Sequence, residues 1–168
     1  MARVRLVPVG KMSDGRKTVL VVDDSSFMRT LVKQILAVDE AFNVIGEAAD
    51  GVTAVAMAMT AKPDIIILDI EMPKMDGLEA MKRLKLFSKA KVIILSSVAQ
   101  VGSEAAQKAR MLGAFEVIPK PSGAISMDLK PKRGRQLLEV IHAAAGLPPP
   151  DFQQLAMRIK QMSVADQP

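Results

Sequence analysis

The sequence of 168 residues contains no cysteine, no tryptophan and no tyrosine, and its single histidine is His142. Without cysteine there is no disulfide framework, no thiol chemistry and no cysteine-based zinc site. All five aromatic residues are phenylalanines, too few to suggest a platform for stacking nucleic-acid bases. No apolar run approaches the roughly 20 residues of a membrane-spanning helix, and no signal-peptide pattern opens the chain. We therefore expect no nucleic acid and no membrane as partner, and a cytoplasmic location.

The net charge of +5 is concentrated at the start of the chain. Residues 1–17 hold five basic side chains against one acidic, a net of +4, so the remaining residues carry about +1. We interpret residues 1–17 as a solvated basic arm, the usual state of a short charged terminus. A second basic cluster is expected in one loop and consists of Lys130, Lys132, Arg133 and Arg135.

Apolar runs of strand length recur between helix-like segments. Three of them, at 19–22, 65–68 and 92–95, are continuous and rich in β-branched residues. Strands that are buried on both faces of a parallel sheet have this composition. Two shorter and more mixed runs, at 44–45 and 117–118, fit edge strands, so the sequence predicts five strands.

Amphipathic helices are predicted between these strands. From Met28 to Leu36, apolar residues recur at i, i+3, i+4, i+7 and i+8, which places them on one helix face. Similar spacing covers 52–62, 78–87, 104–112 and 135–145. This strict alternation of strand and helix predicts a doubly wound α/β sheet.

The domain is expected to span residues 18–146 and to be followed by a tail, residues 147–168. In the tail, a stiff proline-rich spacer precedes a short amphipathic helix that Asp151 is placed to cap. The apolar stripe of this helix consists of Phe152, Leu155, Ile159 and Met162. So short a helix is marginal alone in water, so we expect it to pack on its own domain, near the last two helices, or on a second copy of the chain in a homodimer.

Polar residues follow the predicted strands at their carboxyl ends, where sheets of this class place their sites. Asp23 and Asp24 follow the strand at 19–22, and Asp69 follows the strand at 65–68. Three converging carboxylates raise each other's pKa unless a cation neutralises them, and oxygen ligands without histidine or cysteine suit Mg²⁺. Ser96 and Lys120, after the last two strands, are suited to hold a phosphoryl group. The constellation predicts phosphoryl transfer to a carboxylate.

These motifs resemble those of the CheY-like response-regulator receiver family. The resemblance covers roughly Lys17 to Gly146 and rests on Val19–Ser25, Leu68–Gly77 and Lys120-Pro121, together with the spacing between them. It implies a flavodoxin-like, doubly wound five-stranded parallel sheet in the order 2-1-3-4-5, with helices on both faces.

The resemblance also implies a role for each residue at the strand ends. Asp69 is expected to accept a phosphoryl group from the phosphohistidine of a CheA-like histidine kinase. Ser96 and Lys120 are expected to contact the oxygens of that group. The expected Mg²⁺ ligands are Asp23, Asp24, Asp69 and the main-chain carbonyl of Glu71.

Within the family, the chain is most similar to the receiver of the chemotaxis methylesterase CheB and to free-standing CheY proteins with CheB-like motifs. The similarity rests on Leu95–Val98 and on the long connection at 120–129 before the last receiver helix. One departure is Val117, which stands where many receivers carry an aromatic switch residue. Phe115 is two positions away and is expected on the same face of that strand.

Two interpretations of the function stay open. The chain is either a stand-alone receiver of a chemotaxis system or the receiver part of a CheB-type methylesterase. Residues 163–168 favour the first. No nucleophile turn of the Gly-x-Ser-x-Gly type occurs, so no esterase activity is expected. The downstream target is unknown, and a flagellar motor switch protein is one candidate. A dehalogenase-type phosphatase is disfavoured because Asp69-x-Glu71 has the wrong place and no following threonine.

Overall fold

The computed structural model describes residues 15–72, 74–97, 102–121 and 132–165. The predicted basic arm therefore falls almost wholly outside the described residues, as does Lys130. The five strands are β1 (Lys17–Val22), β2 (Phe42–Ala48), β3 (Ile65–Asp69), β4 (Lys91–Ser96) and β5 (Glu116–Pro119). They form one parallel sheet in the order β2-β1-β3-β4-β5, which confirms the predicted fold class and strand order.

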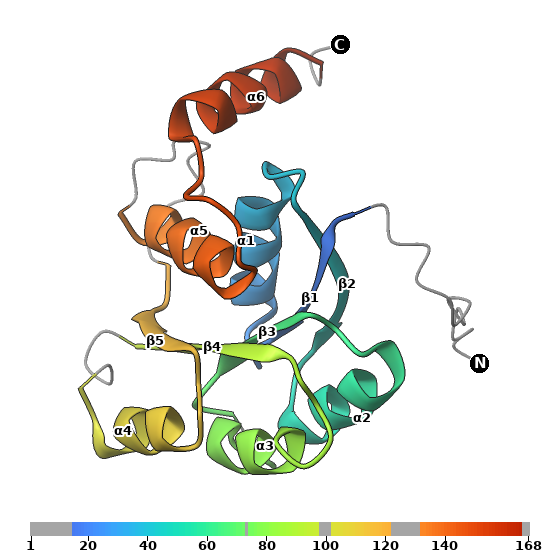
Figure 1. Cartoon of the computed structure of the whole chain (residues 1–168), viewed down its shortest axis with the longest axis vertical. Coiled ribbons are helices and arrows are strands. Elements are labelled where there is room, and N and C mark those ends of the chain that lie inside the picture. The colour runs from blue at the N-terminus through green and yellow to red at the C-terminus, as the bar shows by residue number, and fades with distance from the viewer. Residues whose placement is uncertain (1–14, 73, 98–101, 122–131, 166–168) are drawn as a thin grey trace.

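Helices connect these strands and cover both faces of the sheet (Figure 1). They are α1 (Ser26–Ala37), α2 (Gly51–Ala61), α3 (Gly77–Leu84), α4 (Glu104–Met111), α5 (Lys132–Ala144) and α6 (Phe152–Ala165). The first four each begin after a side chain that accepts a hydrogen bond from the backbone N–H three residues later. These N-caps are Ser25, Asp50, Asp76 and Ser103.

Two hydrophobic layers lie on opposite faces of the sheet. On one face, β1, β3, β4 and β5 pack against α1 and α5, with Leu36 and Leu138 among the fully buried residues. On the other face, α2, α3 and α4 cover the same strands, with Met81 among the fully buried residues. The strand side chains alternate between the two layers, which explains why the predicted central strands are apolar at every position.

The strand register brings the carboxyl ends of the strands level with one another. Val22 of β1 pairs with Leu68 of β3, so Asp23 follows β1 at the height of Asp69. Ser96 of β4 pairs with Pro119 of β5, which places Lys120 at the same edge. The sheet therefore gathers the polar residues predicted from the sequence at one end of the domain.

Helix α6 packs on its own domain. Asp151 caps it by accepting hydrogen bonds from the backbone N–H groups of Gln153 and Gln154. Leu155 and Ile159 are buried in the layer formed by α1 and α5, and Figure 1 shows α6 beside these helices. Docking is thus confirmed for these two side chains. For Met162 it is wrong, since that side chain is 44% exposed.

Polar contacts also hold the tail to the domain. His142 of α5 contacts Asp39 Oδ2 through Nε2 at 2.6 Å and the carbonyl oxygen of Pro148 through Nδ1 at 2.8 Å. Because a carbonyl oxygen only accepts hydrogen bonds, Nδ1 carries the hydrogen. The Arg158 guanidinium pairs with Glu40 at 2.8 Å. These contacts join the tail to α5 and to the turn between α1 and β2.

The prediction for the second basic cluster was wrong. The basic cluster does not lie in one loop, because Lys132, Arg133 and Arg135 belong to α5. The Arg135 guanidinium lies 4.1 Å from the centre of the Phe152 ring, a cation–π contact with α6.

Among the described residues, no helix has the length and apolar character needed to cross a bilayer.

Candidate phosphoacceptor and metal site

Three carboxylates meet at the carboxyl ends of β1 and β3. Asp23 and Asp24 follow β1, and Asp69 is the last residue of β3. One oxygen from each of the three carboxylates lies within 4.8 Å of the other two. Asp23 and Asp69 are buried, whereas Asp24 is exposed. The site is therefore a deep acidic pair with a third carboxylate at its solvent edge.

Lys120 faces the two buried carboxylates from the end of β5. Its Nζ lies 3.0 Å from Asp69 Oδ2 and 3.3 Å from Asp23 Oδ2. The backbone N–H of Lys120 donates to the carbonyl oxygen of Ser96 at 2.7 Å, so β4 and β5 present their last side chains together. All five side chains expected at the site from the sequence thus come from the same edge of the sheet.

Several buried oxygen atoms at the site lack a hydrogen-bond partner among the described residues. Asp23 Oδ2, Asp69 Oδ2 and Ser96 Oγ are buried and have no hydrogen-bond partner there, apart from the ion pairs to Lys120. Buried polar atoms without a partner are rare in folded proteins and call for an explanation. A cation beside the carboxylates and an anion beside Ser96 and Lys120 would supply the missing partners.

The electrostatics of the site also favour a bound cation. Three carboxylates against one ammonium leave a formal charge of −2, which a divalent cation balances. Burial, together with the neighbouring Asp23 charge, raises the pKa of Asp69 to about 7 in the absence of metal. Burial also raises the pKa of Asp23. Burial alone would lower the pKa of Lys120, but Asp69 and Asp23 raise it above its usual value.

Backbone contacts fix the two loops that carry the carboxylates. Asp69 Oδ1 accepts a hydrogen bond from the N–H of Glu71 at 3.0 Å, and Asp23 Oδ1 accepts one from the N–H of Ser25 at 2.9 Å. Gly77 packs directly against the backbone of Asp69: a Cβ there would lie 2.5 Å from the Asp69 carbonyl oxygen. Only glycine permits this close approach of α3 to the end of β3.

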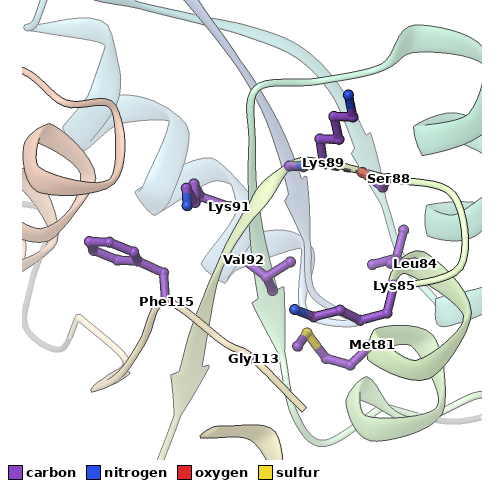
Figure 2. A pocket seen from close by; sticks show the side chains of 10 residues that line it. Met81, Leu84, Lys85, Ser88, Lys89, Lys91, Val92, Gly113 and Phe115 are labelled. Atoms are coloured by element: carbon purple, nitrogen blue, oxygen red, sulfur yellow. Dashed lines mark hydrogen bonds between the residues drawn. The ribbon is translucent and has the colours of Figure 1, made fainter.

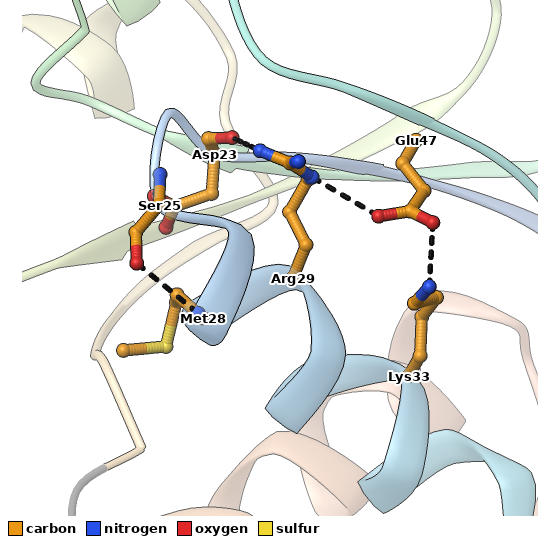
Figure 3. A network of polar contacts seen from close by, with 6 residues as sticks. All are labelled: Asp23, Ser25, Met28, Arg29, Lys33 and Glu47. Atoms are coloured by element: carbon orange, nitrogen blue, oxygen red, sulfur yellow. Dashed lines mark hydrogen bonds and ion pairs between the residues drawn. The ribbon is translucent and has the colours of Figure 1, made fainter.

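Sequence reasoning missed a polar network that supports the β1–α1 turn (Figure 3). Arg29 of α1 donates from Nη1 to the main-chain carbonyl of Asp23 at 2.7 Å and from Nε to Glu47 Oε1 at 3.0 Å. Lys33 donates to the other oxygen of Glu47. Arg29 therefore ties the turn that carries Asp23 and Asp24 to α1 and β2. Nothing in the local sequence indicates this, because Glu47 lies 18 residues further along the chain.

Val117, at the usual position of the aromatic switch residue, and Phe115, two residues before it, differ in burial. Val117 lies within β5 and is buried under α4. Phe115 precedes β5, which begins at Glu116, and its side chain is 40% exposed. Phe115 lies at the amino end of β5, where its N–H donates to the carbonyl oxygen of Val92 at 2.7 Å, at the opposite end of the sheet from the carboxylates.

With the geometry established, comparisons with known proteins identify the family. The model of the response regulator receiver domain matches residues 19–129. A protein-glutamate methylesterase/protein-glutamine glutaminase of Pyrococcus horikoshii is 42% identical over 131 residues, 77% of this chain and 36% of that protein. The chain thus spans about a third of the length of this relative.

Solved structures show the same relationship. The response regulator domain of Thermotoga maritima CheB is 40% identical, with a TM-score of 0.69 over 80% of this chain and 99% of that one. A structure of the P1 domain of CheA3 in complex with CheY6 from R. sphaeroides contains a chain that is 38% identical to this one. The TM-score is 0.65, and the match covers 79% of this chain and 98% of that chain. The chain belongs to the response-regulator receiver family. Its receiver is of the CheB type.

Proposed function

We propose that this receiver accepts a phosphoryl group on Asp69 from the phosphohistidine of a CheA-like histidine kinase. One observation carries the proposal: the buried Asp69 carboxylate faces the Lys120 ammonium at 3.0 Å inside a cluster of three carboxylates. A structural ion pair needs one carboxylate, whereas a phosphoacceptor needs a nucleophile, charge neutralisation and a cation for the phosphoryl oxygens.

In the proposed step, an Asp69 carboxylate oxygen forms a bond to phosphorus as the phosphorus–nitrogen bond to the kinase histidine breaks. The electron pair of that bond stays with the imidazole, which leaves as the neutral ring after taking up a proton. Lys120 pairs with the phosphoryl oxygens as a point charge, and the Ser96 hydroxyl donates a hydrogen bond to one of them. The contact of Lys120 Nζ with Asp69 Oδ2 at 3.0 Å supports this role, because a charge already beside the nucleophile needs little reorganisation.

We further propose that the site binds Mg²⁺ through Asp23, Asp24, Asp69 and the main-chain carbonyl of Glu71. The oxygen-only donor set and the unsatisfied Oδ2 atoms of Asp23 and Asp69 fit this ion. When bound, Mg²⁺ supplies positive charge that offsets the carboxylates and the incoming phosphoryl group.

The output that we propose is a shift between two surface arrangements on phosphorylation, which changes the affinity for a protein partner in a cytoplasmic chemotaxis pathway. The similarity to methylesterases supports a second candidate, the receiver part of a CheB-type enzyme, in which the same site would control an attached catalytic domain.

The test is phosphorylation by acetyl phosphate in the presence of Mg²⁺, followed by intact-protein mass spectrometry. We expect one added phosphoryl group that is lost in base, as acyl phosphates are. Asp69→Asn is expected to remain unmodified, while Asp151→Asn, a matched change at the α6 cap, is expected to behave like the wild type. Equal modification of Asp69→Asn and wild type would reject the assignment.

A further inference from the structure

A small cavity lies at the opposite end of the sheet from the carboxylates, between α3, the start of β4 and the turn before β5 (Figure 2). Its volume is about 200 Å³. Apolar side chains contribute much of its lining, among them Met81, Leu84, Val92 and Phe115. Three lysines, Lys85, Lys89 and Lys91, also line it, and no acidic residue does. We call this feature the lysine-lined cavity.

The three lysines have no acidic side chain beside them in the lining of the cavity. In the described part of the chain, none of Lys85, Lys89 and Lys91 forms an ion pair. Elsewhere, ion pairs join Arg29 and Lys33 to Glu47, Lys108 to Glu104, Arg135 to Glu139 and Arg158 to Glu40. The lysine-lined cavity is therefore a locally positive site whose lining mixes lysine and apolar side chains.

The chain holds one of these lysines at the cavity. The Lys85 ammonium lies against Gly113, where a Cβ would come within 2.1 Å of Nζ. Gly113 has a φ of +96°, a conformation that side chains rarely adopt. A glycine at this turn thus leaves the space that the Lys85 side chain occupies, as Figure 2 shows.

Exposed apolar residues lie close in sequence to the lining of the lysine-lined cavity, and one of them, Phe115, is part of that lining. Leu86 and Met111 are each 86% exposed, and Phe87 and Phe115 are 42% and 40% exposed. Leu86 and Phe87 follow α3, Met111 is the last residue of α4, and Phe115 precedes β5. Phe115 thus adds a partly exposed aromatic ring to the lining of the cavity.

We propose that the lysine-lined cavity docks an acidic polypeptide segment that inserts one large apolar side chain between the three lysines. The volume is below the roughly 300–1,000 Å³ of small-molecule sites, so it suits a single anchoring side chain. The uncompensated lysines select carboxylates on either side of that anchor.

The location gives this surface a role separate from phosphoryl transfer. Five residue steps of β4 separate Lys91 from Ser96, roughly 17 Å at about 3.3 Å per residue. A segment docked at the lysine-lined cavity would leave Asp69 and Lys120 uncovered. The partner and a phosphodonor can therefore occupy the domain together.

The test is a titration of ¹⁵N-labelled full-length protein with a blocked nine-residue peptide of aspartate and glutamate that carries one central phenylalanine. We expect amide shifts at Leu84, Val92 and Gly113. The same peptide with alanine in place of phenylalanine should bind at least fivefold more weakly. Asp69→Asn should bind like the wild type, so the result is independent of the proposed phosphorylation.

Two triple variants separate a specific site from general charge attraction. The variant with glutamine at 85, 89 and 91 should bind the peptide at least tenfold more weakly. The matched variant with glutamine at the exposed positions Lys62, Lys74 and Lys160 should stay within threefold of the wild type. Equal losses in the two variants, or no binding by the wild type, would overturn the proposal.

A single-stranded oligonucleotide and phosphatidylserine vesicles serve as competing probes. Tighter binding of either probe than of the peptide, lost in the variant at 85, 89 and 91, would replace the acidic polypeptide by a nucleic acid or a lipid surface. Weaker binding of both supports the acidic segment.

Discussion

Replacing Asp69 by asparagine is predicted to stabilise the metal-free protein at pH 8. The pKa of Asp69 rises from 3.8 to about 7 on folding because the carboxyl is buried beside Asp23. At about 1.4 kcal/mol for each tenfold change, this corresponds to about 4 kcal/mol at full effect. We expect about half of this, roughly 2 kcal/mol, because water screens the site from the side of Asp24 and because asparagine loses the attraction to Lys120.

The sign of the pH dependence follows from proton binding. Between about pH 4 and pH 7 the folded protein holds a proton on Asp69 that the unfolded chain has lost, so the free energy of unfolding falls as the pH rises. Above pH 7 the full destabilisation is present. Asp69→Asn should therefore gain more at pH 8 than at pH 5, while Asp23 retains a smaller dependence of the same sign.

Urea unfolding in the presence of EDTA, at pH 5 and pH 8, measures this effect. A gain of about 2 kcal/mol also raises the melting temperature by about 4–8 °C for a chain of this size. Asp151→Asn is the control and should leave stability nearly unchanged, since asparagine caps helices as well as aspartate does. Destabilisation of Asp69→Asn at pH 8, or an equal effect at both pH values, would refute the electrostatic argument.

Further predictions concern the metal and α6. Asp24→Ala is expected to weaken Mg²⁺ binding at least tenfold by calorimetry, and unchanged affinity would exclude Asp24 as a ligand. Arg29→Gln should weaken Mg²⁺ binding several-fold, because the turn that carries Asp23 loses the hydrogen bond from Arg29. Lys33→Gln is the control and should leave Mg²⁺ binding unchanged. Equal losses in the two variants would contradict a specific role of Arg29. Ile159→Ala should lower the free energy of unfolding by about 2 kcal/mol and Met162→Ala by less than 0.5 kcal/mol, and similar losses would mean that α6 packs differently.

Much of the fold and of the site was predictable because both depend on short-range patterns. The fully buried strands appear as continuous apolar runs, and in a parallel sheet each strand delivers its next residue to the same edge. The convergence of Asp23, Asp69 and Lys120 then follows from the strand order alone. The resemblance to the receiver family supplied the individual roles, which remain proposals.

The features that were missed depend on contacts between distant segments. The ion pair of Arg29 with Glu47 requires α1 to cross beside β2, and the contact of His142 with Asp39 joins residues 103 positions apart. Helical spacing placed Met162 on the apolar stripe, but its side chain is 44% exposed, whereas Ile159 is buried. The position of Phe115 in the lining of the lysine-lined cavity also depends on distant segments, since α3 and β4 supply the rest of that lining.

The most direct test of the central claim is to locate the phosphoryl group. Borohydride reduces an aspartyl phosphate to homoserine, so protein treated with acetyl phosphate and Mg²⁺ can be reduced, digested and sequenced by mass spectrometry. The account predicts homoserine at position 69 and at no other aspartate. Homoserine at 23 or 24 with intact Asp69, or no homoserine in a protein that has gained phosphate, would contradict it.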